Sequence, residues 1–163
     1  MQATSTFSIT STTFKNEEFL PTKYSSDGED ISPPLAWVGA PPNTKTFALI
    51  NHDPDAPIKN GWTHWVLWNI PSSAKSLPEN VNKSQVKLPD GTIQGQNNWG
   101  NNSYGGPAPP SGTHRYFFNL YALDCELKLP NSTTKAKLEA AMKGHILKEC
   151  QIMAKYSKGG AKK

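Results

Sequence analysis

Four ionisable side chains lie where apolar runs of the sequence give way to segments rich in proline and glycine. Asp53 and Asp55 follow the apolar run that ends at Asn51, and His64 and His114 each begin another run. Aspartate and histidine together can bind a phosphate or an ammonium group, hold a divalent metal ion, or transfer protons as general acid and base. These four residues are therefore the first candidates for a functional site.

The two aspartates belong to the pentapeptide DPDAP at 53–57. Side chains two residues apart in an extended chain point to the same side, with Cα atoms roughly 6.5 Å apart. Pro54 and Pro57 stiffen this segment and lower the entropy cost of presenting both carboxylates. Because Asp53 and His64 are close in sequence, their strands can be antiparallel neighbours that bring both residues to one end of a sheet.

His114 opens the most aromatic run of the chain, HRYFFNLYAL at 114–123. On a strand, His114 and Tyr116 share a face. The preceding segment, 95–112, consists mainly of Gln, Asn, Gly and Pro, and Trp99 is one of its few large side chains. Long loops inside compact domains are usually functional or disordered, and the tryptophan favours an ordered loop. Polar residues that converge at strand ends beside such loops predict a pocket.

The elements that position these residues are mostly strands. Apolar runs at 45–51, 64–70 and 114–123 predict buried strands that are covered on both faces. A first strand is expected within 4–13, and a short hairpin through 85–93, where PDG is a turn tripeptide. The 14 Pro and 12 Gly are scattered along the chain, which is typical of a β-rich fold with many turns.

One helix is predicted near the C-terminus, from about Thr134 to Tyr156. Ser132 and Thr133 are capping residues that precede it. Its apolar residues recur at helical spacing and form a stripe expected to pack on the core, namely Leu138, Met142, Ile146 and Met153.

Length and charge indicate a single domain that does not bind nucleic acid. The 163 residues suit one domain with a core of about 5–156 and a mobile basic tail at 157–163. The net charge of +4 comes largely from lysines near the C-terminus, whereas a nucleic-acid surface carries a basic stripe on the folded body.

Cysteine usage and hydropathy favour a cytoplasmic protein. Cys125 and Cys150 fit no metal-binding spacing, and two reduced thiols are expected, although a disulfide stays open. The first thirteen residues contain no apolar run typical of a secretory signal, and no segment approaches the roughly 18 apolar residues of a membrane span. His52 and His145 have no companion motif and are expected to be structural.

Several motifs, in the same order along the chain, are similar to the phosphatidylethanolamine-binding protein family, which includes Raf kinase inhibitor protein. The motifs are DPDAP at 53–57, WTHW at 62–65, and YGGPAPP at 104–110 leading into HRY at 114–116. Two further segments resemble the prokaryotic-type branch, DGEDISPPL at 27–35 and, in the terminal helix, GH at 144–145.

The resemblance implies a mainly β fold, with a central antiparallel sheet flanked by a second, smaller sheet and a few helices, including a C-terminal helix. It also implies a pocket for a small anionic or zwitterionic ligand such as phosphate or phosphoethanolamine. On this sequence the ligand-binding residues are Asp53, Asp55, Pro57, His64, Gly106, Pro107, His114 and Tyr116. No catalytic residue, metal or cofactor is implied, whereas a signalling partner such as a kinase and a homodimer are.

The expected chemistry of this pocket rests on the two histidines. Asp53 and Asp55 would orient and charge His64 and His114, so that both protonated rings donate to phosphate oxygens. Phosphate binding would then strengthen as the pH falls from about 8 towards 6, where histidine gains its proton. The amides of the Gly105-Gly106 turn could add further donors.

Two alternatives remain open at this point. The Asp/His cluster could serve a metal-dependent or acid/base hydrolase, although no HxH, HExxH or GxSxG motif occurs. The chain could also be a pure protein-interaction module in which the pocket has no ligand.

Overall fold

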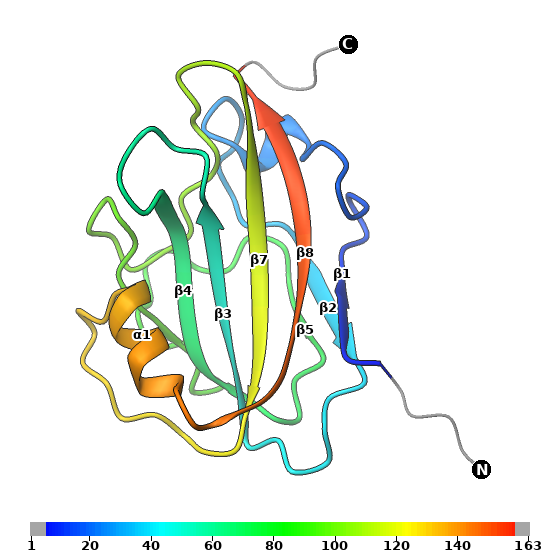
Figure 1. The fold of residues 1–163 in the computed structure, drawn as a ribbon, viewed down its shortest axis with the longest axis vertical. Helices are drawn as coiled ribbons and strands as arrows, with labels where there is room; N and C mark the ends of the chain where they lie inside the picture. Colours follow the sequence, from blue (N-terminus) through cyan, green and yellow to red (C-terminus); the bar gives the residue numbers. More distant parts are fainter. Residues whose placement is uncertain (1–5, 159–163) are drawn as a thin grey trace.

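The computed structural model describes residues 6–158, which form two antiparallel sheets packed against each other (Figure 1). The large sheet has the strand order β6-β4-β3-β7-β8 and the small sheet the order β1-β2-β5. The elements are β1 Ser8–Thr10, the 3-10 turn η1 Thr22–Tyr24, β2 Leu35–Val38, β3 Thr46–Asp53, β4 Trp62–Pro71, β5 Ser76–Leu77, β6 Ile93–Gln94, β7 Thr113–Leu123, α1 Lys135–Met142 and β8 Ile146–Ser157.

The three apolar runs form the centre of the large sheet, as the sequence predicts. Strand β3 pairs with β4 on one side and with β7 on the other. Its alternate side chains enter two different cores: Phe47 and Leu49 pack towards the small sheet, whereas Ala48 and Ile50 pack on the opposite face. A strand buried on both faces needs apolar residues at nearly every position, which explains the unbroken run.

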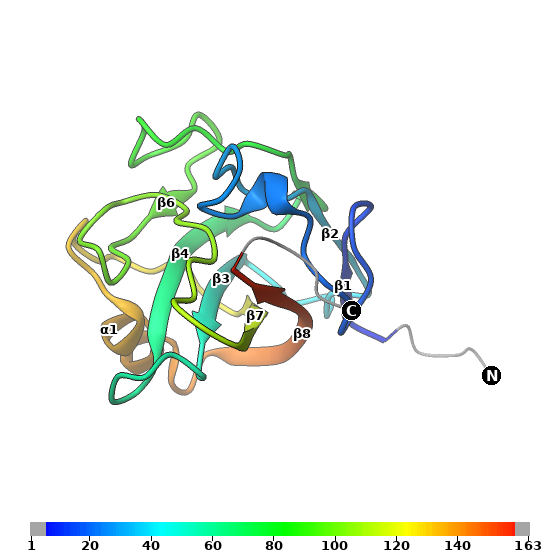
Figure 2. The ribbon, with the colours of Figure 1, turned by 90° about the horizontal axis from the view of Figure 1, so that it is seen from above.

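Helix α1 covers the second face of the large sheet. Its buried residues Leu138 and Met142 pack with Ile50 and Val66. Figure 2 shows α1 and the pair β1 and β2 on different sides of the large sheet. The expected fold is thus confirmed: a central antiparallel sheet with a smaller sheet on one side and a helix on the other.

The predicted extent of the helix is wrong. Only 135–142 is helical, and 146–157 forms β8, which pairs with β7 along its whole length. The expected placement of Gly144 and His145 in a terminal helix fails for the same reason, because they lie in the turn before β8. Burial along β8 has the period of two typical of a strand, because Ile152, Ala154 and Tyr156 are all buried. Pairing satisfies the backbone groups of β7 that a helix here would have left without partners.

The other expected elements are shorter than predicted. The first strand is limited to β1, and positions 4 and 5 lie outside the described residues. The hairpin through 85–93 is a tight turn closed by the bridge between Lys87 and Ile93, in which Gly91 adopts a φ of +100°. The expected mobile tail begins too early, because Ser157 still belongs to β8, and 159–163 lie outside the described residues.

Two further expectations concern the thiols and the membrane. Cys125 and Cys150 are both free, so the chain has no disulfide between them. Within residues 6–158 the only α-helix is far too short to cross a bilayer.

Candidate functional site

A pocket of about 270 Å³ opens at the end of the large sheet where β3 stops and where β4 and β7 start. Figure 1 shows these strand ends at the upper edge of the sheet. The antiparallel order brings these three strand ends together, although the start of β7 is distant in sequence from the other two. The residues that line the pocket are Asp53, Ala56, Pro57, Ile58, Trp62, His64, Trp99, Ala108, Pro109, Pro110, His114 and Tyr116. The wall is mainly apolar and contains a small number of polar groups, the usual composition of a ligand pocket.

The innermost polar contact joins Asp53 at the end of β3 to His114 at the start of β7. The Nδ1 atom of His114 lies 2.6 Å from Oδ2 of Asp53, and the two residues are 8% and 2% exposed. The other carboxylate oxygen of Asp53 accepts the backbone N–H of Asp55 at 2.7 Å. Because Nδ1 donates to the carboxylate, Nε2 is the ring atom of His114 that a ligand can use. It accepts a hydrogen bond when the ring is neutral and donates one when the ring is protonated.

A β-bulge in β4 brings His64 to the same pocket. Asn51 of β3 lies opposite Trp65, and the next residue, His52, lies opposite Thr63, so His64 is an extra residue in β4. Bulges of this kind re-aim a side chain relative to the strict alternation of a strand. The His64 ring consequently lies 5.2 Å from the ring of Tyr116, on the wall of the pocket.

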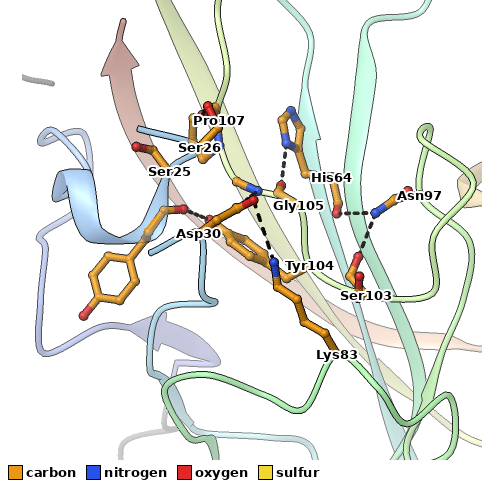
Figure 3. Close-up of polar contacts among 12 residues, drawn as sticks. Ser25, Ser26, Asp30, His64, Lys83, Asn97, Ser103, Tyr104, Gly105 and Pro107 are labelled. Atoms are coloured by element: carbon orange, nitrogen blue, oxygen red, sulfur yellow. Dashed lines mark hydrogen bonds and ion pairs between the residues drawn. The ribbon is translucent and has the colours of Figure 1, made fainter. Parts of the chain in front are cut away.

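His64 is neutral, which contradicts the expectation that it donates to an anion as an imidazolium. Its Nδ1 donates to the carbonyl oxygen of Gly105 at 2.7 Å (Figure 3). Burial lowers the pKa of His64 to about 4, despite the opposing effect of the Gly105 carbonyl. In the neutral ring with a proton on Nδ1, Nε2 is a hydrogen-bond acceptor. The predicted dependence of binding on protonation of both histidines between about pH 8 and 6 therefore fails for His64.

Tyr116 adds a neutral phenol to the wall. Burial, followed by the negative charge of Asp53, raises the pKa of Tyr116 well above its ordinary value. The ring packs edge-on against His64 and lies nearly parallel to His114, with centroids 6.3 Å apart in the second pair. Tyr116 thereby contacts both imidazole rings of the pocket.

The loop that carries Gly105 is held by contacts with the rest of the fold (Figure 3). The Tyr104 hydroxyl donates to the carbonyl of Tyr24, and the N–H of Gly106 donates to Asp30, each at 2.7 Å. The N–H of Gly105 donates to the carbonyl of His64 at 3.0 Å. Both glycine amides are thus engaged with the protein, and the expected extra anion donors are not directed at the pocket.

Asp55 is not among the residues that line the pocket. Its carboxylate accepts two hydrogen bonds from the guanidinium of Arg115 and one from the Arg115 backbone N–H, all at 2.9 Å. The hydrogen bond from the Arg115 side chain lowers the pKa of Asp55. The part of the expectation in which Asp55 orients a histidine is wrong, because its carboxylate bonds Arg115 and anchors the 53–57 segment to the start of β7. Its charge still interacts with that of His114.

The structure thus brings together part of the predicted set and adds residues to it. Five predicted residues line the pocket, Asp53, Pro57, His64, His114 and Tyr116. Three predicted residues, Asp55, Gly106 and Pro107, do not line it.

The additional wall residues are mostly aromatic or proline. Trp99 packs edge-on against Trp62 and His64, with ring centroids 5.5 Å and 5.0 Å away. Trp99 is also 43% exposed, so it forms part of the rim. Two sequence signals pointed to this pair: the WTHW motif, and a lone tryptophan in a loop of small polar residues.

The pocket residues do not provide a metal site. Among residues 6–158, the donor atoms of Asp53, Asp55, His64 and His114 do not gather into a group of three that could share one ion. Asp53 and Asp55 are engaged by His114 and Arg115 respectively. The arrangement therefore supports hydrogen bonding to a small molecule better than metal-dependent hydrolysis.

Comparison with known proteins agrees with this architecture. Residues 10–157 match the family model described as phosphatidylethanolamine-binding protein. A UPF0098 protein of Methanothermobacter thermautotrophicus is 49% identical over 146 residues, covering 90% of this chain and 95% of that relative. The UPF0098 protein YbhB of Escherichia coli is 40% identical over 133 residues, 80% of this chain and 84% of its own length.

Solved structures show the same fold. The crystal structure of E. coli YbcL, described as a member of the mammalian PEBP family, superposes with a TM-score of 0.87 at 33% identity, covering 93% of this chain and 98% of YbcL. The homologue CT736 from Chlamydia trachomatis gives a TM-score of 0.85 at 35% identity, covering 93% of this chain and 97% of CT736. Matches of this extent, together with the shared fold, mean that the chain belongs to the phosphatidylethanolamine-binding protein family.

Proposed function

We propose that the chain binds a small zwitterionic or anionic molecule in the pocket of Asp53, His64 and His114 and does not convert it chemically. The observation that carries this proposal is the buried Asp53–His114 pair, which holds a polar ring at the wall of an otherwise mainly apolar pocket. Burying such groups is costly unless they are hydrogen-bonded, and this pair meets that condition while leaving Nε2 of His114 available to a ligand. The names of the family and of the relatives described above state no enzymatic activity.

The charges in the pocket favour a zwitterion such as phosphoethanolamine over a bare phosphate dianion. Asp53 places a carboxylate at the pocket, and His64 is neutral. A dianion would meet this carboxylate with at most one imidazolium to offset the repulsion. In a zwitterion, the phosphate can accept from Nε2 of protonated His114, while the ammonium lies towards Asp53 and the acceptor nitrogen of His64.

The size of the pocket suits a head group. Its volume of about 270 Å³ lies just below the range of roughly 300–1,000 Å³ that is typical of sites for drug-sized ligands. A molecule with the dimensions of phosphoethanolamine fills such a space. Any longer apolar portion would leave past Ile58 and Trp99, which are 54% and 43% exposed at the rim.

Calorimetric titration of the purified chain with phosphoethanolamine, inorganic phosphate and ethanolamine tests this proposal. We expect the zwitterion to bind more tightly than either fragment, and His114→Ala to abolish its binding. His145→Gln, which removes a histidine remote from the pocket, is the matched control and should leave binding unchanged. Equal affinities of wild type and His114→Ala for phosphoethanolamine, or no binding to wild type, would contradict the proposal.

The family resemblance adds a regulatory part to the proposal. We infer that a signalling partner, such as a kinase, binds at the pocket rim formed by Ile58 and Trp99. Its binding would then depend on whether the pocket holds a ligand. His114→Ala should then remove the effect of the ligand on partner binding. Unaltered ligand-dependent partner binding in this variant would restrict the proposed function to the ligand alone.

We also propose that this function is carried out in the cytoplasm. Both cysteines are free, which is typical of proteins in a reducing compartment. Fractionation of cells that express the chain tests this location, and recovery outside the cytoplasm would contradict it.

A further inference from the structure

A second group of functional side chains lies at the opposite end of β7 from the pocket. Asp124 and Cys125 directly follow β7, and His145 directly precedes β8. One donor atom from each residue lies within 4.8 Å of the donor atoms of the other two. His114 and Asp124 are at opposite ends of an extended strand, roughly 30 Å apart, so this group is independent of the pocket.

The backbone around these three residues is held in place. The N–H of Asp124 donates to the carbonyl of His145 at 3.0 Å, and Thr46 Oγ1 donates to the carbonyl of Cys125 at 2.7 Å. The N–H of His145 donates to the carbonyl of Met142 at 2.8 Å, across a turn in which Gly144 has a φ of +87°. The donor set is therefore fixed by β3, β7 and the C-terminal end of α1.

The spacing of the donor atoms is close to that of a tetrahedral metal site. Ligands at zinc distances of about 2.0–2.3 Å lie roughly 3.3–3.8 Å from one another. Nδ1 of His145 and Oδ1 of Asp124 are 2.9 Å apart, joined by a hydrogen bond whose proton an ion can replace. Small side-chain rotations would bring these two atoms and the sulfur to ligand distances.

The types of donor select the metal. Thiolate and imidazole ligands suit zinc and neighbouring transition metals, whereas magnesium and calcium prefer oxygen alone. The side chains of His145 and Asp124 are 45% and 43% exposed, so an ion can enter from solvent and keep water in its fourth position.

Neither of the simpler functions explains all three residues. A reactive cysteine would account for Cys125 but not for the pairing of His145 with Asp124 beside it. A surface hydrogen bond between His145 and Asp124 accounts for two of the residues but not for the neighbouring thiol.

We propose that Asp124, Cys125 and His145 bind one divalent ion per chain, zinc or a neighbouring transition metal, with a solvent molecule as the fourth ligand. The site links the turn after β7 to the turn before β8. It would fasten the end of the longest strand pair of the fold.

Titration of the chelator-treated full chain with Co²⁺ tests this site, because a cobalt–thiolate bond produces a charge-transfer band. We expect one equivalent of Co²⁺ to bind with this band and Zn²⁺ to displace it. Cys125→Ser should remove the band. His145→Gln should weaken binding more than about tenfold, since even groups that only support a ligand contribute tenfold or more.

The second free cysteine provides the matched control. Cys150→Ser removes a thiol that belongs to no such group within residues 6–158 and should retain the band and the affinity. Circular dichroism of each variant verifies that it is folded. The proposal is overturned if wild type gives no thiolate band, if Cys125→Ser binds as well as wild type, or if Cys150→Ser loses the band.

Discussion

His114 donates its Nδ1 proton to Asp53 across 2.6 Å, although 61 positions separate the two residues in the sequence. The contact exists because β3 and β7 are antiparallel neighbours, so that the end of one strand meets the start of the other. Both residues are buried at the pocket, which makes this pair the basis of several expectations.

The first prediction concerns the energy of this pair. His114→Ala leaves the Asp53 carboxylate buried without its imidazole, and we expect a loss of about 3 kcal/mol in the free energy of unfolding. Urea denaturation measures this loss. In the double variant Asp53→Asn/His114→Ala the loss should be smaller than the sum of the two single losses by at least about 0.5 kcal/mol. Additive losses would show that the two side chains are not coupled.

The second prediction concerns pH and His64. The pKa of His64 is about 4 in the folded chain, whereas an unfolded chain has the ordinary value of about 6.5. Between these values the unfolded state binds more protons, so the contribution of His64 to stability is present above about pH 6.5 and is lost as the pH falls towards 4. The expected loss is about 3 kcal/mol.

Urea denaturation at a series of pH values, on wild type and on His64→Asn, measures this effect. Asparagine can still donate to the Gly105 carbonyl but does not titrate, so the variant should lose this part of the pH dependence. Ser111→Ala, which keeps every histidine in place, is the control and should behave as wild type. The same slope in wild type and His64→Asn would contradict the assignment of a neutral buried His64.

The third prediction separates the two aspartates of the DPDAP segment. Asp55 pairs with Arg115 at the surface and does not line the pocket, so Asp55→Asn should change the denaturation midpoint and the affinity for phosphoethanolamine only slightly. Asp53→Asn, the same substitution two residues earlier, should lower both clearly. Comparable effects of the two substitutions on ligand affinity would contradict the assignment of Asp55 to the outside of the pocket.

The fourth prediction concerns Gly105, which is labelled in Figure 3, and its neighbour Gly106. A Cβ at Gly106 would lie 2.3 Å from the carbonyl oxygen of Tyr24, so Gly106→Ala should cost about 1–3 kcal/mol in stability. A Cβ at Gly105 would lie 2.4 Å from the Trp99 ring, which is partly exposed and can move. Gly105→Ala should therefore affect the pocket rim more than stability.

Denaturation and tryptophan fluorescence distinguish these two outcomes. Gly105→Ala should alter the emission of Trp99 and weaken ligand binding while largely retaining the unfolding midpoint. For Gly106→Ala, the midpoint should fall. A control substitution, Ser111→Ala in the exposed segment before β7, should change neither. An unchanged midpoint in Gly106→Ala would mean that the loop accommodates the methyl group.

The central strands and most of the polar residues of the pocket were predictable because local sequence patterns indicate them. Runs that are apolar at nearly every position have to be buried on both faces, which identifies β3, β4 and β7 as central strands. Motifs at their ends identified Asp53, His64 and His114 before any contact was known. Trp62 was visible within its motif, but no periodicity indicates that a side chain at a strand end lines a cavity.

The end of the chain was not predictable from local patterns. Leu138, Met142, Ile146 and Met153 fit a helical stripe, yet the helix ends at Met142 and the last two residues of that stripe belong to β8. Without β8, one edge of β7 would be unpaired. Pairing with β8 gives partners to all eleven residues of that edge, and this decides the outcome. A partner strand is a tertiary property, and it overrides the helical preference of the segment.

By itself, the sequence determined the β-rich class, the central strands, the family resemblance and most of the polar residues of the pocket, because composition and alternation express burial directly. Only the tertiary structure decided the states of those residues: a bulge turns His64 into the pocket and burial keeps it neutral, while Arg115 holds Asp55 outside. It also brought His145 to Asp124 and Cys125. Protonation and ligand geometry depend on neighbours that are distant along the chain, and the linear order of residues does not specify those neighbours.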